Sequence, residues 1–239
     1  MPGTSTTPSA AIDLVIFDSD GVLVDSEHLA LGVMAEHACA AGAEMSVDEA
    51  VRLFRGWKIS DCVLEIERRS GRPTAATFID DVRHATARAF ECDLLAVEGV
   101  HAALDLITAP ICVASNGPLF KLTQTLSLTS LLARFEGRIF SAYEVGSWKP
   151  EPGLFLHAAR SLGADPTRCV VVEDSIPGVR AALAAGMRVL GYAGAGPEAA
   201  MELAEAGAEV FHHMRDLPTL LTSPAAGSAV PAAARSTER

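Results

Sequence analysis

Three aspartates stand close together at the end of the first apolar run of the chain. Asp18, Asp20 and Asp25 follow the segment IDLVIF at residues 12–17. Like charges repel, so carboxylates this close raise the free energy unless a positive charge lies among them. Asp18 and Asp20 are two positions apart and can face the same side of an extended chain. The pattern indicates a site that binds a cation or carries out nucleophilic and acid–base chemistry.

Polar residues follow three later apolar runs in the same way. They are Ser115 and Asn116 after residues 110–114, Lys149 after 138–142, and Glu173 and Asp174 after 168–172. Each group alone is typical of a turn, a helix cap or a solvated surface. Four such groups in order are not expected by chance. Carboxylates suit Mg²⁺, while a hydroxyl, an amide and a lysine suit a phosphoryl group, so the set favours phosphoryl transfer.

The runs that precede these groups have the pattern of buried parallel strands. Strands are predicted at 12–17, 110–114, 138–142, 168–172, 187–191 and 208–212, and helices at 98–108, 117–133, 152–163, 176–185 and 197–206. The central runs are apolar throughout, as in strands that are covered on both faces. The alternation predicts an α/β fold with a doubly wound, Rossmann-like parallel sheet. Ligands bind at the carboxyl ends of such strands, where the polar groups stand.

One long interval interrupts the alternation. Residues 28–97 show helical periodicity and no convincing strand, and a parallel crossover does not need so many residues. We therefore predict a core domain made of 11–27 and 98–222, with 28–97 as an inserted helical domain. Residues 1–10 and 223–239 are low in bulky apolar side chains and are predicted to be a disordered N-terminus and a flexible tail.

The overall composition is that of an ordinary globular protein. The chain has 239 residues, is 49% hydrophobic and 21% charged, and carries a formal net charge of −11. So negative a surface argues against nucleic acid and anionic membranes as partners. The five cysteines show no spacing typical of a disulfide or zinc framework. No leader or long apolar span is evident, so we expect a cytoplasmic protein, most simply a monomer.

The ordered motifs resemble those of the haloacid dehalogenase superfamily of phosphatases. The string from Asp18 to Ser26, DSDGVLVDS, is similar to the first family motif, and Ser115, Lys149 and Glu173-Asp174 are similar to the second, third and fourth. The insertion at 28–97 resembles the helical cap of the β-phosphoglucomutase and phosphoglycolate phosphatase group. Within that group, the core segments look most like the bacterial 6-phosphogluconate phosphatases.

The resemblance implies a role for each motif residue. Asp18 would be the nucleophile, and Asp20 would protonate the leaving oxygen and later activate water. Mg²⁺ would be held by the side chains of Asp18 and Asp174, by the main-chain carbonyl of Asp20, and by Glu173 through water. The transferring phosphoryl group would be bound by Ser115, by the amide of Asn116 and by Lys149. Asp25, Ser26 and Glu27 would support orientation and the cap hinge.

A basic segment in the insertion bears on the substrate. Residues 52–58 hold Arg52, Arg55 and Lys58 in a chain that is otherwise strongly acidic. Related caps use this segment to reach the end of the substrate that does not react. Arg55 and Lys58 are therefore expected to bind a second anion, such as the carboxylate of a sugar-acid phosphate, whereas a solvated helix end remains the alternative.

Two other functions compete with a phosphatase that acts on a small phosphorylated metabolite. A phosphomutase of the β-phosphoglucomutase type is disfavoured because Ala30 stands where those relatives have a histidine. A receiver-like regulatory protein also uses an acidic cluster with serine and lysine on a doubly wound sheet. That alternative is disfavoured by the insertion at 28–97 and by Asp20, which a receiver does not need.

Overall fold

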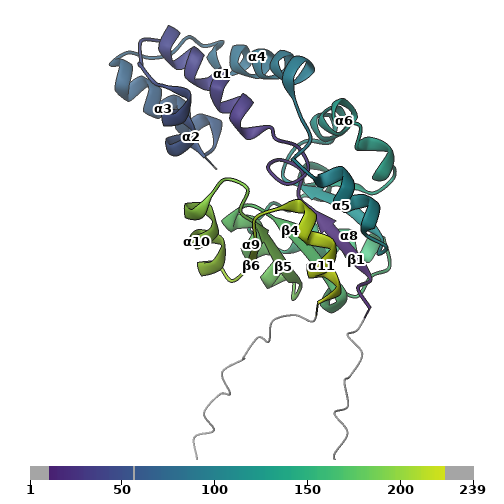
Figure 1. The fold of residues 1–239 in the computed structure, drawn as a ribbon. Coiled ribbons are helices and arrows are strands. Elements are labelled where there is room, and N and C mark those ends of the chain that lie inside the picture. Colours follow the sequence, from purple (N-terminus) through teal and green to yellow (C-terminus); the bar gives the residue numbers. More distant parts are fainter. Residues whose placement is uncertain (1–10, 56, 224–239) are drawn as a thin grey trace, which may run out of the picture.

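The computed structural model describes residues 11–55 and 57–223, and its larger part is a parallel sheet (Figure 1). The strands are β1 (Leu14–Phe17), β2 (Ile111–Ser115), β3 (Ile139–Ser141), β4 (Cys169–Glu173), β5 (Arg188–Tyr192) and β6 (Glu209–Phe211). Their order is β3-β2-β1-β4-β5-β6, and every neighbouring pair is parallel. The chain thus starts in the middle of the sheet, builds one edge, and returns to build the other. This confirms the predicted α/β class and the doubly wound parallel sheet.

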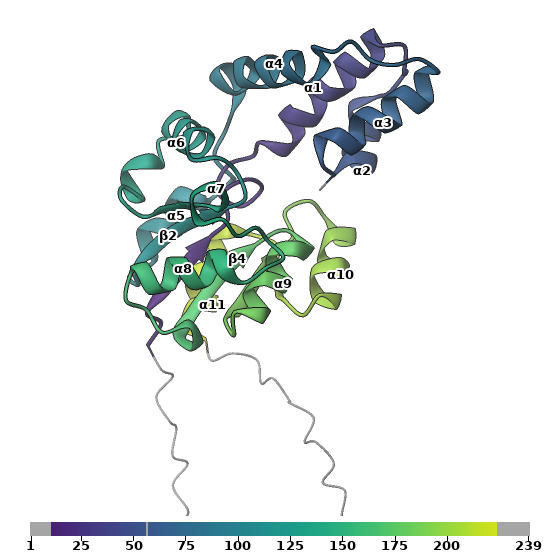
Figure 2. The same ribbon diagram turned by 180° about the vertical axis from the view of Figure 1, so that it is seen from behind.

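Both faces of the sheet are covered by helices, as the apolar strands require. The helices of this part are α5 (Val100–Leu106), α6 (Leu119–Leu128), α7 (Ala142–Val145), α8 (Gly153–Ser161), α9 (Ile176–Ala184), α10 (Pro197–Glu205) and α11 (Leu217–Thr222). Helices α5 and α11 lie in front of the sheet in Figure 1, and α8 and α9 lie in front of it in Figure 2.

The strand residues alternate between two hydrophobic cores. Along β1, Val15 and Phe17 belong to the core under α5, α6 and α11, whereas Leu14 and Ile16 belong to the core under α8, α9 and α10. All four side chains are fully buried. The alternation follows from the two-residue period of a strand, and it fixes which residues can point into the cores.

The predicted strands all overlap observed ones, but one predicted helix is too long. The pattern over 117–133 predicted one helix, whereas α6 ends at Leu128 and a separate 3₁₀ turn, Leu132–Arg134, follows. Ser130 stands between them with a φ of 59°, a left-handed conformation that a continuing helix excludes. Short helices α7 and α11 lay outside the predicted helices.

The interval between β1 and β2 is helical. It contains α1 (Glu27–Ala40), α2 (Val47–Phe54), α3 (Ile59–Ser70) and α4 (Phe78–Asp93), which we call the helical insertion. The insertion has a hydrophobic core of its own, in which Phe54 and Ile66 are fully buried. Figures 1 and 2 show it as a separate group of helices beyond one end of the sheet, near α6 and α10. Its limits as a domain, 28 and 97, stay predictions.

Two short segments join the helical insertion to the sheet, and they are hydrogen-bonded to each other. Val97 N donates to Leu23 O at 3.0 Å, and Asp25 N donates to Leu95 O at 2.9 Å. The turn that precedes them is tight, because the N–H groups of Leu23 and Val24 both donate to Ser19 O. The insertion therefore begins within a few residues of the acidic cluster after β1.

The predicted disordered N-terminus, 1–10, and the predicted tail, 223–239 apart from Ser223, lie outside the described residues. Within the described residues, no helix is both long and apolar enough to cross a membrane. The five cysteines are all free thiols, and Cys62, Cys112 and Cys169 are buried.

Candidate active site

The carboxyl ends of the three central strands bring the predicted motifs to one place. In the sheet register, Phe17 of β1 lies opposite Val113 of β2 and Val172 of β4. Asp18 follows β1 directly, and its N–H donates to Val172 O at 3.0 Å. Ser115 ends β2, and Glu173 ends β4. Parallel pairing alone thus places the first, second and fourth groups side by side.

Lys149 completes this site from the segment after β3. Its ammonium group donates to Asp18 Oδ1 at 2.6 Å and to Glu173 Oε1 at 2.5 Å, and its side chain is only 4% exposed. Burial alone would lower the pKa of Lys149, but the two carboxylates outweigh it and raise that pKa above its usual value. The lysine therefore remains a cation beside Asp18, where negative charge must be neutralised in phosphoryl transfer.

The side chain of Asn116 sets the position of the Lys149 backbone. Its Oδ1 accepts from Lys149 N at 2.9 Å, and its Nδ2 donates to Lys149 O at 3.4 Å. Sequence reasoning assigned the amide of Asn116 a contact with the phosphoryl group and did not foresee this contact of its side chain with the Lys149 backbone. Ser115 lies next to it and is buried, and its Oγ accepts from Gly117 N at 3.3 Å.

Glu173 is fully buried and organises the loop after β4. Its Oε2 accepts from Asp174 N at 3.1 Å, from Ser175 N at 3.0 Å and from Ser175 Oγ at 2.8 Å. The carboxylate lies against the first turn of α9, where a Cβ on Gly178 would come within 1.9 Å of Glu173 Cδ. Only glycine fits at that position, so the helix start and the carboxylate are built around each other.

Asp18, Glu173 and Asp174 together have the chemistry of a divalent-cation site. One carboxylate oxygen from each lies within 4.8 Å of the others. Burial raises the pKa of Asp18 to about 6, because it outweighs the nearby Lys149. Burial and the neighbouring carboxylates also raise the pKa of Asp174. Ionised together, these groups repel one another, and a bound cation relieves that repulsion.

The backbone beside this cluster leaves room for the carboxylates. Gly21 has a φ of 76°, and a Cβ there would come within 2.1 Å of Asp174 Oδ2. The Asp174 carboxylate occupies the space that a side chain on Gly21 would fill, so glycine is needed for this close approach. The donor set fits a hard cation that binds oxygen ligands, as Mg²⁺ does.

Asp20 lies apart from Lys149 and has two other partners. Ser26 Oγ donates to its Oδ1 at 2.5 Å, and Lys121 Nζ donates to its Oδ2 at 2.8 Å. Burial would raise the pKa of Asp20, but Lys121 and Ser26 outweigh it and hold that pKa below its usual value. Sequence reasoning missed Lys121, which stands in the first turn of α6, six residues after Ser115. Its only sequence signal was its closeness to the second motif.

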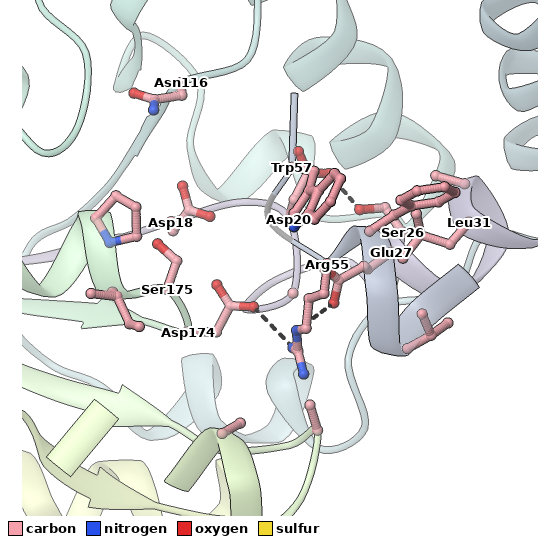
Figure 3. Close-up of a pocket in the computed structure, with 18 of the residues that line it drawn as sticks. Asp18, Asp20, Ser26, Glu27, Leu31, Arg55, Trp57, Asn116, Asp174 and Ser175 are labelled. Carbon is pink, nitrogen blue, oxygen red and sulfur yellow. Dashed lines mark hydrogen bonds and ion pairs between the residues drawn. The ribbon is translucent and has the colours of Figure 1, made fainter. Parts of the chain in front are cut away.

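A cavity of about 1050 Å³ opens from these carboxylates toward the helical insertion. Its walls come from the strand ends, from α1, α2 and α4, and from α10. Figure 3 shows Arg55 between Glu27 and Asp174. Arg55 Nε is 3.0 Å from Glu27 Oε2, and Arg55 Nη2 is 3.8 Å from Asp174 Oδ2, so this one cation reaches the strand end from the insertion.

A family comparison matches most of the described chain. The sequence model of the haloacid dehalogenase-like hydrolases matches residues 12–186. The chain belongs to the haloacid dehalogenase-like hydrolase family. The matched part runs from β1 through α9 and contains Asp18, Lys149 and Asp174, so the predicted enzyme class, a hydrolase of this family, is confirmed.

Individual relatives within the haloacid dehalogenase-like family cover nearly the same length. The 6-phosphogluconate phosphatase of Escherichia coli (strain K12) is 34% identical over 210 residues, which are 87% of this chain and 94% of that protein. A solved haloacid dehalogenase-like protein of unknown function from Agrobacterium tumefaciens str. C58 has a TM-score of 0.82 and 39% identity, and the match covers 88% of this chain and 98% of that one.

A second solved structure in the family was obtained with ligands. It is a HAD family hydrolase from Deinococcus radiodurans R1 with bound phosphate and sodium, with a TM-score of 0.79 and 30% identity over 89% of this chain and 96% of that one. These likenesses extend through the insertion as well as the sheet, because they cover far more than the core segments alone.

Most, but not all, of the residues singled out from sequence lie at the cavity or directly behind it. Asp18, Asp20, Asn116, Asp174 and Arg55 line the cavity, whereas Ser115, Lys149 and Glu173 are buried behind it. Lys58 precedes α3, is exposed, and does not line the cavity. Of the neighbouring basic residues, Arg52 does line it.

Proposed function

We propose that the protein is a Mg²⁺-dependent phosphatase that hydrolyses a small phosphate monoester through an aspartyl-phosphate on Asp18. The observation that carries this proposal is the contact of Lys149 with both Asp18 and Glu173, beside Asp174. A carboxylate held next to a buried cation, with a free face toward a cavity, is suited to attack a phosphorus atom.

Each step uses a named residue of this chain. An Asp18 oxygen attacks phosphorus, the bond from phosphorus to the ester oxygen breaks, and the leaving oxygen keeps its electron pair and takes a proton from Asp20. Asp20 then takes a proton from water, whose oxygen attacks phosphorus, and the bond to Asp18 breaks to release phosphate. Ser115, the Asn116 amide and Lys149 would bind the phosphoryl oxygens.

Mg²⁺ is the cation that we propose for the acidic cluster. Asp18, Asp174 and the main-chain carbonyl of Asp20 would hold it, and Glu173 would act through water. When bound, Mg²⁺ supplies positive charge that offsets the charge of the carboxylates and of the phosphate. Chelation followed by addition of Mg²⁺, Ca²⁺ or Mn²⁺ would identify the ion, with phosphate release and thermal stability as two separate readouts.

For the substrate, we propose a sugar phosphate or sugar-acid phosphate such as 6-phosphogluconate. Arg55 and Arg52 line the cavity from the helical insertion, and Arg55 extends to Asp174 at the strand end. A ligand whose phosphate meets Asp18 would extend toward these guanidinium groups, which suit a carboxylate. The E. coli relative named above is a 6-phosphogluconate phosphatase, which supports the same class. Lys58 would contribute only if the segment around it moves.

The test is phosphate release from a panel of substrates, with and without Mg²⁺. The panel would hold 6-phosphogluconate, glucose 1-phosphate, phosphoglycolate and pyrophosphate. We expect Mg²⁺-dependent turnover that is fastest with the sugar-acid phosphate. A preference for the neutral sugar phosphate would retain the chemistry and reject the carboxylate contact. Transfer of one phosphoryl group per protein molecule, without release of phosphate, would reject the phosphatase in favour of a phosphate-holding, receiver-like protein.

A phosphomutase is the second enzymatic candidate, and the same panel addresses it. Ala30 lines the cavity where the mutase relatives are expected to have a histidine. We therefore propose water as the phosphoryl acceptor. Conversion of glucose 1-phosphate to glucose 6-phosphate, without release of phosphate, would contradict this assignment. We also propose a monomer, to be checked by light scattering on the purified protein.

A further inference from the structure

Lys121 holds a position that the proposed mechanism above does not use. Its ammonium group donates to Asp20 Oδ2 at 2.8 Å, while Ser26 Oγ donates to the other oxygen at 2.5 Å. The two donors come from different parts of the chain. Ser26 directly precedes α1 of the helical insertion, whereas Lys121 lies in the first turn of α6. The Asp20 carboxylate is therefore held from two sides and cannot rotate freely.

The place of Lys121 in its own helix does not account for the residue. The N-terminus of a helix carries partial positive charge, so a cation in the first turn is electrostatically unfavourable there. The side chain is 34% exposed, lines the cavity, and its Nζ lies 5.9 Å from the ring centroid of Phe90 in α4. Phe90 is itself buried. The ammonium group thus lies at the junction of sheet core and helical insertion.

We propose that Lys121 is a positioning residue that fixes the direction of the Asp20 carboxyl group toward the leaving oxygen. The inference rests on the proposed function, because it requires Asp20 to donate a proton to an ester oxygen. Proton transfer needs the donor and acceptor atoms within hydrogen-bond reach, so a carboxyl group that rotates away loses the reaction. Ser26 alone holds one oxygen and leaves the other free to move.

The dependence of rate on the leaving group tests this role directly. Sugar phosphates leave as poorly stabilised alkoxides and need the proton, whereas p-nitrophenyl phosphate leaves as a stable phenolate and needs it little. Lys121→Met should lower kcat/KM for the preferred sugar phosphate by about 10- to 100-fold and for p-nitrophenyl phosphate by no more than about 3-fold. Loss of the cation also lets the pKa of Asp20 rise, which favours its protonated form, so a fall in rate reports lost positioning and not lost acidity. Because kcat/KM covers the steps through phosphorylation of Asp18, later hydrolysis does not obscure the comparison.

Three further variants sharpen the result. Lys121→Arg keeps a cation and should restore part of the sugar-phosphate rate. In an Asp20→Asn background, Lys121→Met should have almost no further effect, because the group that it positions is gone. Arg134→Met is the matched control, because it removes a cation that follows α6 and whose ion pair, within the described part of the chain, is with Asp105 at the surface. This control should leave unchanged the ratio of kcat/KM for the sugar phosphate to kcat/KM for p-nitrophenyl phosphate.

The possible outcomes separate this inference from the proposed function. Equal losses on both substrates, or a rise in KM alone, would overturn it and make Lys121 a binding or structural residue. If Lys121→Met melts like the wild type and its ratio of kcat/KM for the two substrates is unchanged, the inference is overturned, whereas the proposal of a phosphatase still stands. If the wild type released phosphate from neither substrate, both ideas would fail. If Lys121→Met were poorly folded, Lys121→Gln would take its place in the comparison.

Discussion

The strand ends and the basic segment of the helical insertion each place a cation beside the carboxylates that line the cavity, but the two cations are held differently. Lys149 is 4% exposed and contacts two carboxylates at 2.5 and 2.6 Å. Arg55 is 32% exposed, and its contacts with Glu27 and Asp174 are 3.0 and 3.8 Å. A buried, short contact fixes a group in one place, whereas a half-exposed, longer one is screened and can exchange partners.

The contrast suggests a division of work between the two regions. Groups at the strand ends must stay in place while a bond to phosphorus forms and breaks, which demands little movement. Groups in the insertion meet the variable end of the substrate, where a cation that exchanges partners is useful. Substitutions at the strand ends should therefore lower kcat, and substitutions in the insertion should raise KM.

The largest effect is expected at Asp18. Asp18→Asn keeps the shape of the side chain but removes the nucleophile, so phosphate release should fall by about 10⁴-fold or more. Asp13→Asn is the matched control, because Asp13 precedes the same strand at its other end and pairs with Arg168. Steady-state assays with melting curves would make the comparison, and an Asp18→Asn enzyme that turned over at about a tenth of the normal rate would contradict the assignment.

Lys149→Met should affect both activity and folding. It leaves Asp18 and Glu173 buried without their cation, which should cost roughly 3–5 kcal/mol of unfolding free energy at neutral pH. We expect kcat to fall by about 10²-fold or more in the fraction that remains folded. Denaturant unfolding would measure the first effect and active-site-normalised assays the second. A variant as stable as the wild type would show that the strand ends do not depend on this contact.

A pair of glycines tests how tightly each region is built. In a helix interior, Gly→Ala normally stabilises by about 0.5–1 kcal/mol. Gly32→Ala in α1 should follow that rule, because the nearest atom outside the helix that the new Cβ would meet, among the described residues, is Val47 Cγ1 at 3.8 Å. Gly178→Ala should do the reverse and lower kcat by about 10-fold or more, because its Cβ would displace the carboxylate of Glu173. Equal changes in melting temperature for Gly32→Ala and Gly178→Ala would contradict the expected difference between the two regions.

In the insertion, Arg55→Gln should raise KM by about 10-fold for a sugar-acid phosphate and change kcat little. It should also strengthen Mg²⁺ binding slightly, since Asp174 loses a competing cation. Arg83→Gln is the matched control, because Arg83 also belongs to the helical insertion but pairs with Asp80 at the surface and does not line the cavity. Calorimetric titration would measure the affinity for Mg²⁺, and steady-state kinetics would measure KM. Identical values for the two variants would exclude a special role for Arg55.

The smallest expected effect is on the pH dependence of thermal stability. Burial raises the pKa of Asp18 to about 6 in the metal-free protein, above its usual value. The stabilisation that protonated Asp18 contributes to the free energy of unfolding is therefore fully present below about pH 4 and is lost as the pH rises through 6. Mg²⁺ binds the ionised carboxylates, so it should raise the Tm more at pH 7.5 than at pH 5. An equal rise at both values would argue against this cluster as the cation site.

Much of the core could be predicted from the sequence because its signals are local. Apolar runs such as 168–172 specify buried strands by themselves, and Asp18 and Glu173 follow their strands directly. In a parallel doubly wound sheet, residues at the strand ends must meet, so the site follows once the strands are identified. Lys149 required more, because its segment begins beyond β3, but the prolines that follow it in the sequence WKPEP distinguished the motif.

The sequence by itself determined the fold class, the helical insertion and the order of the chemical groups along the sheet edge. These depend on strand periodicity and on residues next to strand ends. Only the tertiary structure decided that Lys121 holds Asp20, that the Asn116 side chain holds the backbone of Lys149, and that Arg55 reaches Asp174. Such contacts join residues far apart in the chain, and their existence depends on how helices pack onto the sheet, which no local pattern specifies.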